Sequence, residues 1–130
     1  MIDDGQVVGD MIHVTDLYTT FARLAGATKY IPTDRIVDGL DQTALLLNGD
    51  TNGRRDSVFI YTGNELAATV KGRYKRHWIG AGEAAAAGTP EAYYDLYMDP
   101  REENPQLVPL IHTQGQFNQM VARHQLFKKK

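Results

Sequence analysis

The sequence predicts an α+β fold, in which a small four-stranded antiparallel sheet packs with a C-terminal helix and is preceded by one further helix. Four short segments rich in β-branched and aromatic residues follow one another in the second half of the chain, separated by turn formers. Segments with apolar residues at helical spacing stand before and after them. The 130 residues, 42% hydrophobic and 23% charged, have the composition of one ordinary globular domain.

The first helix is expected to begin at Thr15, a candidate N-cap, with Asp16 in the first turn, where the helix dipole favours a carboxylate. Gly26 supplies the C-terminal stop. The apolar residues between them fall at 3.6-residue spacing and are Leu17, Phe21, Leu24 and Ala25. Residues 27–56 are rich in turn formers, so we expect a connecting loop with one or two helical turns at 44–47.

Three strands are expected in quick succession, at 57–62, 65–71 and 73–79. Gly63-Asn64 and Gly72 provide the short turns that antiparallel hairpins require.

An irregular loop at 80–90 leads to a fourth strand at 92–98. A final helix is expected at about 109–127, because its apolar residues form one stripe. That stripe consists of Leu110, Phe117, Met120, Val121, His124 and Phe127.

Both faces of the predicted strands carry apolar or aromatic side chains, whereas a sheet with one solvated face alternates apolar and polar residues. We expect the final helix to cover the face that carries Tyr94, Leu96 and Met98. The helix residues expected to pack there are Phe117, Met120 and Val121. The opposite face is left for another partner and carries Phe59, Tyr61, Tyr93 and Tyr97. In an isolated chain, this open face predicts self-association, most simply a two-fold homodimer.

Composition argues against several partners and sites. A net charge of −2 gives no general attraction to nucleic acid or to an anionic membrane, and Lys128–Lys130 are explained by their favourable place at a helix end. No apolar run approaches the roughly 20 residues of a membrane span. The sequence has no cysteine, which excludes disulfides, thiolate metal sites and a cysteine nucleophile. Residues 1–5 lack the features of a signal peptide, so the compartment stays unknown.

Four motifs follow one another through most of the chain. The first is Asp-Leu-x-x-Thr at 16–20, with Leu-Ala-Gly at 24–26. The second is Pro-x-Asp-Arg-x-x-Asp-Gly-x-Asp at 32–41. The third is Gly-x-Tyr-Lys at 72–75, followed by His77. The fourth is Asp-Leu-x-x-Asp-Pro-x-Glu at 95–102, with Asn104 just beyond.

This series of motifs resembles the C-terminal end of the sulfatase family, the arylsulfatase-like hydrolases of sulfate esters. The resemblance implies that residues 1–56 are the last helix and connecting loop of the main sulfatase domain, and that residues 57–130 form the C-terminal α+β subdomain. That subdomain is expected to pack on the family's upstream catalytic domain and to complete its substrate cleft. The parent protein is then a sulfuric ester hydrolase. Formylglycine and Ca²⁺ or Mg²⁺ are expected in the catalytic domain, with no cofactor in this segment.

The sequence departs from the family pattern at two positions. Thr19 stands where the family usually has Pro, and Val70 stands where it often has Arg, so any polar role of that Arg is lost. The family's formylglycine arises from Cys or Ser in a Cys/Ser-x-Pro-x-Arg motif. Ser57, the one serine, is followed by Val58-Phe59-Ile60 and lacks the Pro and Arg of that motif. We therefore assign no catalytic residue and expect this segment alone to be inactive.

Three cations are candidates for the substrate cleft. Lys75 and His77 project from one face of the third strand together with Arg73, because side chains alternate along a strand. They either reach toward an anionic sulfate ester at the domain junction or pair at the surface with Asp95 or Glu65.

No metal site is predicted. Asn48-x-Asp50-x-Asn52-Gly53 with Asp56 imitates the start of an EF-hand loop, but Phe59 stands where the bidentate Glu is needed, so we expect a polar turn. The histidines lack ligand spacing and are expected to be structural or exposed: His13, His77, His112 and His124.

Two functions remain open at this point. The chain is either the non-catalytic C-terminal part of an arylsulfatase-like enzyme or a free-standing α+β module that binds a protein through the exposed face of its sheet. A longer reading frame with Cys/Ser-x-Pro-x-Arg upstream would decide between them.

Overall fold

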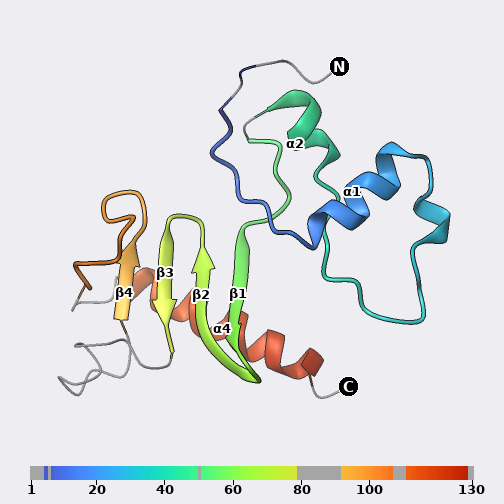
Figure 1. Cartoon of the computed structure of the whole chain (residues 1–130). Helices are drawn as coiled ribbons and strands as arrows, with labels where there is room; N and C mark the ends of the chain where they lie inside the picture. The colour runs from blue at the N-terminus through green and yellow to red at the C-terminus, as the bar shows by residue number, and fades with distance from the viewer. Residues whose placement is uncertain (1–4, 6, 50, 79–91, 107–110, 129–130) are drawn as a thin grey trace. The chain divides into compact units, whose positions relative to one another are not determined.

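The computed structural model describes residues 5, 7–49, 51–78, 92–106 and 111–128 (Figure 1). The side chains of residues 111, 112 and 128 are outside this description. The chain divides into two compact units, Met1–Asp56 and Ser57–Lys130, which are described separately below. Among the described residues, no helix has both the length and the apolar character needed to cross a membrane.

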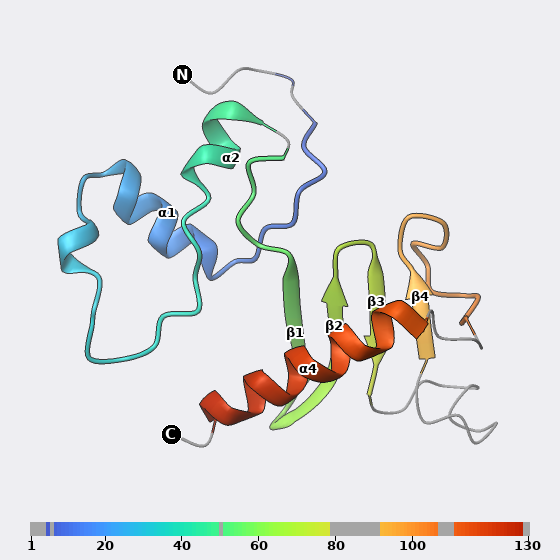
Figure 2. The ribbon, with the colours of Figure 1, turned by 180° about the vertical axis from the view of Figure 1, so that it is seen from behind.

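The second unit contains an antiparallel sheet of four strands in the order β1-β2-β3-β4. The strands are β1 (Ser57–Thr62), β2 (Glu65–Lys71), β3 (Tyr74–His77) and β4 (Ala92–Asp95). The helix α4 (Ile111–Lys128) lies across one face of this sheet, as the two opposite views in Figures 1 and 2 show. The predicted α+β fold is therefore confirmed, while the predicted loop at 80–90 lies outside the described residues.

The hairpin turns form where the sequence places its glycines. Gly63 and Gly72 have φ angles of 59° and 53°, in the left-handed region where a side chain would be strained. The register of β1 against β2 shifts between Ile60 and Tyr61, which marks a β-bulge.

The helix α4 covers the aromatic face of the sheet. Tyr93 is aligned across the strands with Arg76, Thr69 and then Phe59, so these four side chains lie on one face. Phe117 of α4 is 1% exposed, and its ring centroid lies 6.0 Å from that of Tyr93 in an edge-on contact.

The end of α4 packs on the same face. The His124 ring stacks on Phe59 with 3.9 Å between centroids, and its Nε2 lies 2.7 Å from the hydroxyl of Tyr61. Beneath the helix, the buried Arg76 guanidinium lies 3.7 Å from the Trp78 ring centroid and donates a 2.6 Å hydrogen bond to Asn118 Oδ1.

The predicted choice of face was wrong. Tyr94 lies on the side opposite α4, where it packs with Ala92 and Leu96. Phe59, Tyr61 and Tyr93, which were expected to be open to a partner, instead contact α4. Because both faces of the strands carry apolar side chains, the alternation of residues does not indicate which face α4 covers.

The fourth strand is also shorter than predicted. It ends at Asp95, because the carboxylate of Asp95 accepts hydrogen bonds from the backbone N–H groups of Tyr97 and Met98 and turns the chain. Tyr97 and Met98 are consequently 70% and 80% exposed, so Met98 takes no part in the expected packing.

The first unit contains α1 (Asp16–Leu24), the short 3-10 helix η1 (Thr28–Tyr30) and α2 (Thr43–Asn48). Thr15 makes no capping hydrogen bond from its side chain, contrary to the sequence prediction. The Asp16 carboxylate accepts a hydrogen bond from the N–H of His13 instead.

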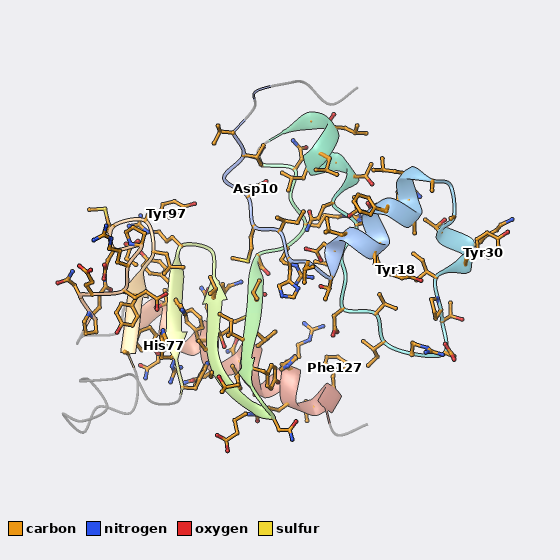
Figure 3. The ribbon with its side chains drawn as sticks, in the orientation of Figure 1. Asp10, Tyr18, Tyr30, His77, Tyr97 and Phe127 are labelled. Carbon is orange, nitrogen blue, oxygen red and sulfur yellow. The ribbon has the colours of Figure 1, made fainter. Side chains whose placement is uncertain are left out.

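The helix α1 buries its polar side. Asp16 and Thr20 are both 0% exposed, whereas Phe21 is 58% exposed. Other large apolar residues of the helix are also exposed, namely Leu17, Tyr18 and Leu24. Tyr18 of α1 and Tyr30 of η1 are both exposed and are labelled in Figure 3. Within this unit, the apolar stripe of α1 therefore does not form a core.

We predict that Phe117→Ala lowers the free energy of unfolding by about 3–5 kcal/mol, the usual cost of removing a buried aromatic ring. Phe127→Ala, on the same helix at a position 53% exposed, is the matched control and should change it by no more than about 0.5 kcal/mol. Urea unfolding followed by circular dichroism measures both. Equal effects of the two substitutions would contradict the packing of α4 described above.

Candidate functional site

The predicted cations Lys75 and His77 lie on the sheet face opposite α4. Lys75 is aligned with Val70 and Tyr94, and His77 is aligned with Ala68 and Ala92 on the neighbouring strands. Arg73 precedes β3 in the turn that follows Gly72. The structure shows which carboxylate each of the three cations contacts.

Arg73 binds Asp95 through two atoms of its guanidinium group. Its Nε donates a 2.9 Å hydrogen bond to Asp95 Oδ1, and its Nη2 contacts Oδ2. This hydrogen bonding raises the pKa of Arg73 and lowers the pKa of Asp95. Of the two carboxylates considered as surface partners, Arg73 thus pairs with Asp95 and not with Glu65.

Lys75 and His77 share a single carboxylate, that of Glu102. Lys75 Nζ lies 2.7 Å from Oε1, and His77 Nε2 lies 2.8 Å from Oε2 (His77 is labelled in Figure 3). The sequence analysis did not identify Glu102 as their partner, because Glu102 is separated from His77 by 25 residues.

The backbone of the following turn places Glu102 over the sheet. Glu102 has a φ angle of 58°, which is uncommon for a residue with a side chain. Its N–H donates to the carbonyl of Asp99, whose carboxylate accepts from the N–H groups of Glu103 and Asn104. The Asp-Pro-x-Glu motif therefore builds a turn whose last residue binds back onto β3.

The electrostatics of this cluster follow from burial and charge together. Burial alone would raise the pKa of Glu102, but the hydrogen bonds from Lys75 and His77 outweigh it and lower this pKa. Burial raises the pKa of the Tyr94 phenol, and the negative charges of Glu102 and Asp99 add to the effect. The His77 ring meets that of Tyr94 edge-on at 5.4 Å between centroids.

A second polar centre lies on the buried side of α1. Arg55 donates from Nε to Oδ2 of Asp16 at 2.7 Å and from Nη2 to Oδ1 at 2.5 Å. The backbone N–H groups of Leu40 and His13 donate to the same carboxylate at 2.8 and 2.9 Å. The carboxylate of Asp16 thus connects three separate segments of the unit.

Burial would raise the pKa of Asp16, but the hydrogen bonds and charge of Arg55, with the backbone donors, hold this pKa well below its usual range. Thr20 extends the centre, since its hydroxyl donates to the carbonyl of Asp16 and accepts from the N–H of Gln42. The first two sequence motifs therefore meet in one hydrogen-bonded centre.

Gly39, from the second motif, has a steric role in this centre. A Cβ atom at position 39 would lie 2.2 Å from the carbonyl oxygen of Thr15, so any larger residue would force the loop away from α1.

Comparisons with known proteins find similarity to sulfatases. No family model matches the sequence. Over 65% of its length the chain is 39% identical to N-acetylgalactosamine-6-sulfatase from Mus musculus, and over 81% it is 28% identical to steryl-sulfatase from Rattus norvegicus. The crystal structure of the PsFucS1 sulfatase from Pseudoalteromonas sp. matches 96% of the chain with a TM-score of 0.79 and 26% identity. The chain is therefore similar in sequence and in fold to part of several sulfatases.

The chain spans only part of each relative: 16% of the N-acetylgalactosamine-6-sulfatase, 22% of the steryl-sulfatase and 27% of the PsFucS1 sulfatase. In the described structure, Ser57 does not suit a formylglycine site. It opens β1 and is aligned with Lys71 of β2, and the residues after it are those of an ordinary strand.

The loop that imitates an EF-hand and the histidines were the remaining candidate metal ligands, and those that the structure describes contact other protein groups. Among the described residues, no group of three or more acidic, histidine or cysteine side chains is arranged to hold a metal ion. In the loop that imitates an EF-hand, the amide of Asn52 donates to the carbonyl of Gly49, while Asp50 lies outside the described residues. His13 Nδ1 lies 2.9 Å from the Thr15 hydroxyl. His124 contacts Phe59 and Tyr61, as described above, and the side chain of His112 is outside the described part.

We predict that Asp16→Asn destabilises the protein by about 3–5 kcal/mol at neutral pH, because it leaves Arg55 without its buried counter-charge. Asp34→Asn, at an exposed pair with Arg35, is the matched control and should leave the stability nearly unchanged. Urea unfolding gives both values.

The pH dependence of the Asp16 effect has a definite sign. Because the pKa of Asp16 is lowered in the folded state, its stabilisation is complete above the unfolded value of about 3.9 and is lost as pH falls toward the folded value. The difference between wild type and Asp16→Asn should therefore stay constant from pH 7 to 5 and shrink only below about pH 4. A difference that vanished at pH 6 would contradict this assignment.

We predict that Glu102→Gln lowers stability by about 1–3 kcal/mol, the range for lost hydrogen bonds to charged groups. Glu103→Gln is the control, since the Glu103 carboxylate lies 3.9 Å from Arg101 and is exposed. The folded pKa of Glu102 is lowered, so its contribution is present above about pH 4.3 and declines as the pH falls further. If Glu103→Gln cost as much as Glu102→Gln, the bridge to Lys75 and His77 would carry no stability.

Proposed function

We propose that the chain is the C-terminal, non-catalytic part of an arylsulfatase-like sulfuric ester hydrolase, which packs on the catalytic domain and completes its substrate cleft. In this proposal, residues 1–56 are the last helix and connecting loop of the main domain, and residues 57–130 are the C-terminal subdomain. The observation that carries it is the outward-facing apolar stripe of α1.

An amphipathic helix in a globular protein normally turns its apolar stripe toward a core. In α1 the stripe is exposed, and the buried side is fixed by the hydrogen bonds of Asp16 and Thr20. Leu45 is the one large apolar residue of this unit that is buried among its described residues. A contiguous exposed apolar surface of this kind marks an interaction site.

The partial coverage of the relatives supports the identity of the partner. Most of each relative's chain lies outside the match, and in the proposal that remainder supplies the surface that covers α1. Hydrolysis of sulfate esters, by a formylglycine with Ca²⁺ or Mg²⁺, is proposed for that remainder. N-acetylgalactosamine-6-sulfatase and steryl-sulfatase are named for different substrates, and we propose none for the parent protein.

For the cleft, we propose that the surface of Lys75, His77 and Arg73 is the part of this segment that lies nearest the substrate. Lys75 and His77 lie on the sheet face that α4 leaves uncovered. Because Glu102 and Asp95 already neutralise these cations, a sulfate ester would have to compete with a carboxylate for each of them.

A free-standing interaction module is the second candidate. The observation that favours it is the core that α4 forms with Tyr93, since it gives the unit from Ser57 onward packing of its own. A longer reading frame with Cys/Ser-x-Pro-x-Arg upstream would exclude this candidate.

Self-association of the isolated chain also stays a prediction. Of the aromatic residues first expected to form a dimer, Phe59, Tyr61 and Tyr93 contact α4, and only Tyr97 is largely exposed, at 70%. The sheet face opposite α4 is therefore the one proposed for self-association. Sedimentation velocity over a concentration series tests it, and a constant monomer mass would contradict it.

We predict that the isolated 130-residue chain does not hydrolyse an aryl sulfate chromogen in the presence of Ca²⁺ or Mg²⁺. The reason is that Ser57 lies in a strand without the Pro and Arg of the formylglycine motif. Ser57→Ala is the control for any residual signal. Turnover that co-purifies with the chain and persists in Ser57→Ala would show that the segment has a catalytic centre of its own.

We predict that Phe21→Asp changes the stability of the isolated chain by no more than about 0.5 kcal/mol, because the side chain faces solvent there. In the longer sulfatase polypeptide, the same substitution should bury a charge against the catalytic domain and sharply lower soluble yield and thermal midpoint. Asp34→Asn serves as the control in both. Equal tolerance of Phe21→Asp in the two polypeptides would contradict the proposed packing.

A further inference from the structure

A polar surface cavity of about 430 Å³ lies between the last turn of α1, the start of α2 and the segment before β1. Its lining residues are Arg23, Asp41, Thr43, Ala44 and Arg54. All of them belong to the Met1–Asp56 unit, so the cavity is complete within one compact part of the chain. Its volume falls within the range of about 300–1,000 Å³ that is usual for small-molecule sites.

Among the described lining residues, Asp41 is the only one with a carboxylate, and this carboxylate already accepts hydrogen bonds. Asp41 Oδ1 accepts hydrogen bonds from the backbone N–H of Thr43 at 3.0 Å and from the Thr43 hydroxyl at 2.5 Å. These hydrogen bonds are the largest cause of its lowered pKa, and the charges of Arg23 and Arg54 lower it further. Asp41 is therefore a fixed anion held by its own loop.

The two guanidinium groups are less fully engaged. Arg54 Nη1 lies 3.9 Å from Asp41 Oδ2, beyond hydrogen-bonding distance, and its side chain is exposed. The guanidinium of Arg23 makes no hydrogen bond or ion pair within the described part of the chain, although its charge acts on Asp41. Two cations thus line the cavity with one carboxylate, so the charges of its described lining sum to a net positive value.

We propose that this cavity binds the oxyanion group of a small ligand, a sulfate, phosphate or carboxylate, between the guanidinium groups of Arg23 and Arg54. A guanidinium presents paired N–H donors that match two oxygens of such a group. Ala44 adds a small apolar surface against which the body of the ligand rests. The proposal does not depend on the assignment of the chain to a larger enzyme.

The test uses NMR of the arginine Nε–Hε groups in the 130-residue chain, titrated with sodium sulfate while sodium chloride keeps the ionic strength constant. We expect saturable shifts for Arg23 and Arg54 and none for Arg35. Arg23→Gln and Arg54→Gln should each weaken the apparent affinity about tenfold. Arg35→Gln, which removes an exposed arginine paired with Asp34, is the matched control and should leave it unchanged.

A second arm identifies the source of the oxyanion by comparing inorganic sulfate, glucose 6-sulfate and glucose. Tighter binding of glucose 6-sulfate than of sulfate supports a sulfated saccharide as the ligand, and equal binding supports a site for the oxyanion alone. Glucose binding as tightly as glucose 6-sulfate would overturn the proposal. Shifts that rise linearly with any salt, or an equal loss in Arg35→Gln, would overturn it as well. The comparison of sulfate with chloride uses the wild-type chain and stands without the variants.

Discussion

The ion pair between Asp16 and Arg55 sets the orientation of α1, and the arrangement of the Met1–Asp56 unit depends on it. A buried carboxylate is stable only when its charge is matched and its oxygens are hydrogen-bonded. Asp16 meets this requirement with donors from Arg55, Leu40 and His13. The helix must then turn its Asp16 side inward, and its apolar stripe is left facing outward.

In the unit that contains the sheet, carboxylates of the fourth motif likewise pair with cations in and next to the third motif. Glu102 reaches back from a turn built by Asp99 and joins Lys75 to His77, just as Asp95 holds Arg73. Lys75, His77 and Arg73, the candidate cations of the substrate cleft, thus also tie the chain after β4 to the sheet. In both units, motifs far apart in the chain are joined by one carboxylate, which gives a physical reason for these residues to occur together.

Features encoded by neighbouring residues could be predicted from the sequence. The hairpins depend on Gly63 and Gly72 and on alternation, so the first three strands and the two turns between them followed directly. The face covered by α4 could not be predicted, because it depends on contacts such as Arg76 with Asn118, separated by 42 residues. The orientation of α1 was hidden for the same reason, since its stripe is typical of a buried helix and the partners of Asp16 lie 24 and 39 residues away. Glu102 was missed because only the turn at Asp99 brings it over β3.

The orientation of α1, with its polar side buried and its apolar side exposed, can be measured directly. The sequence has no cysteine, so a single introduced thiol reports the exposure of one position. The most direct measurement compares the rate of thiol modification in Thr20→Cys and Phe21→Cys, two neighbouring positions that are 0% and 58% exposed. With this orientation, Phe21→Cys should react nearly as fast as in urea, while Thr20→Cys in the folded chain should react at least about tenfold more slowly than in urea. Protection of Phe21→Cys together with rapid reaction of Thr20→Cys would contradict it.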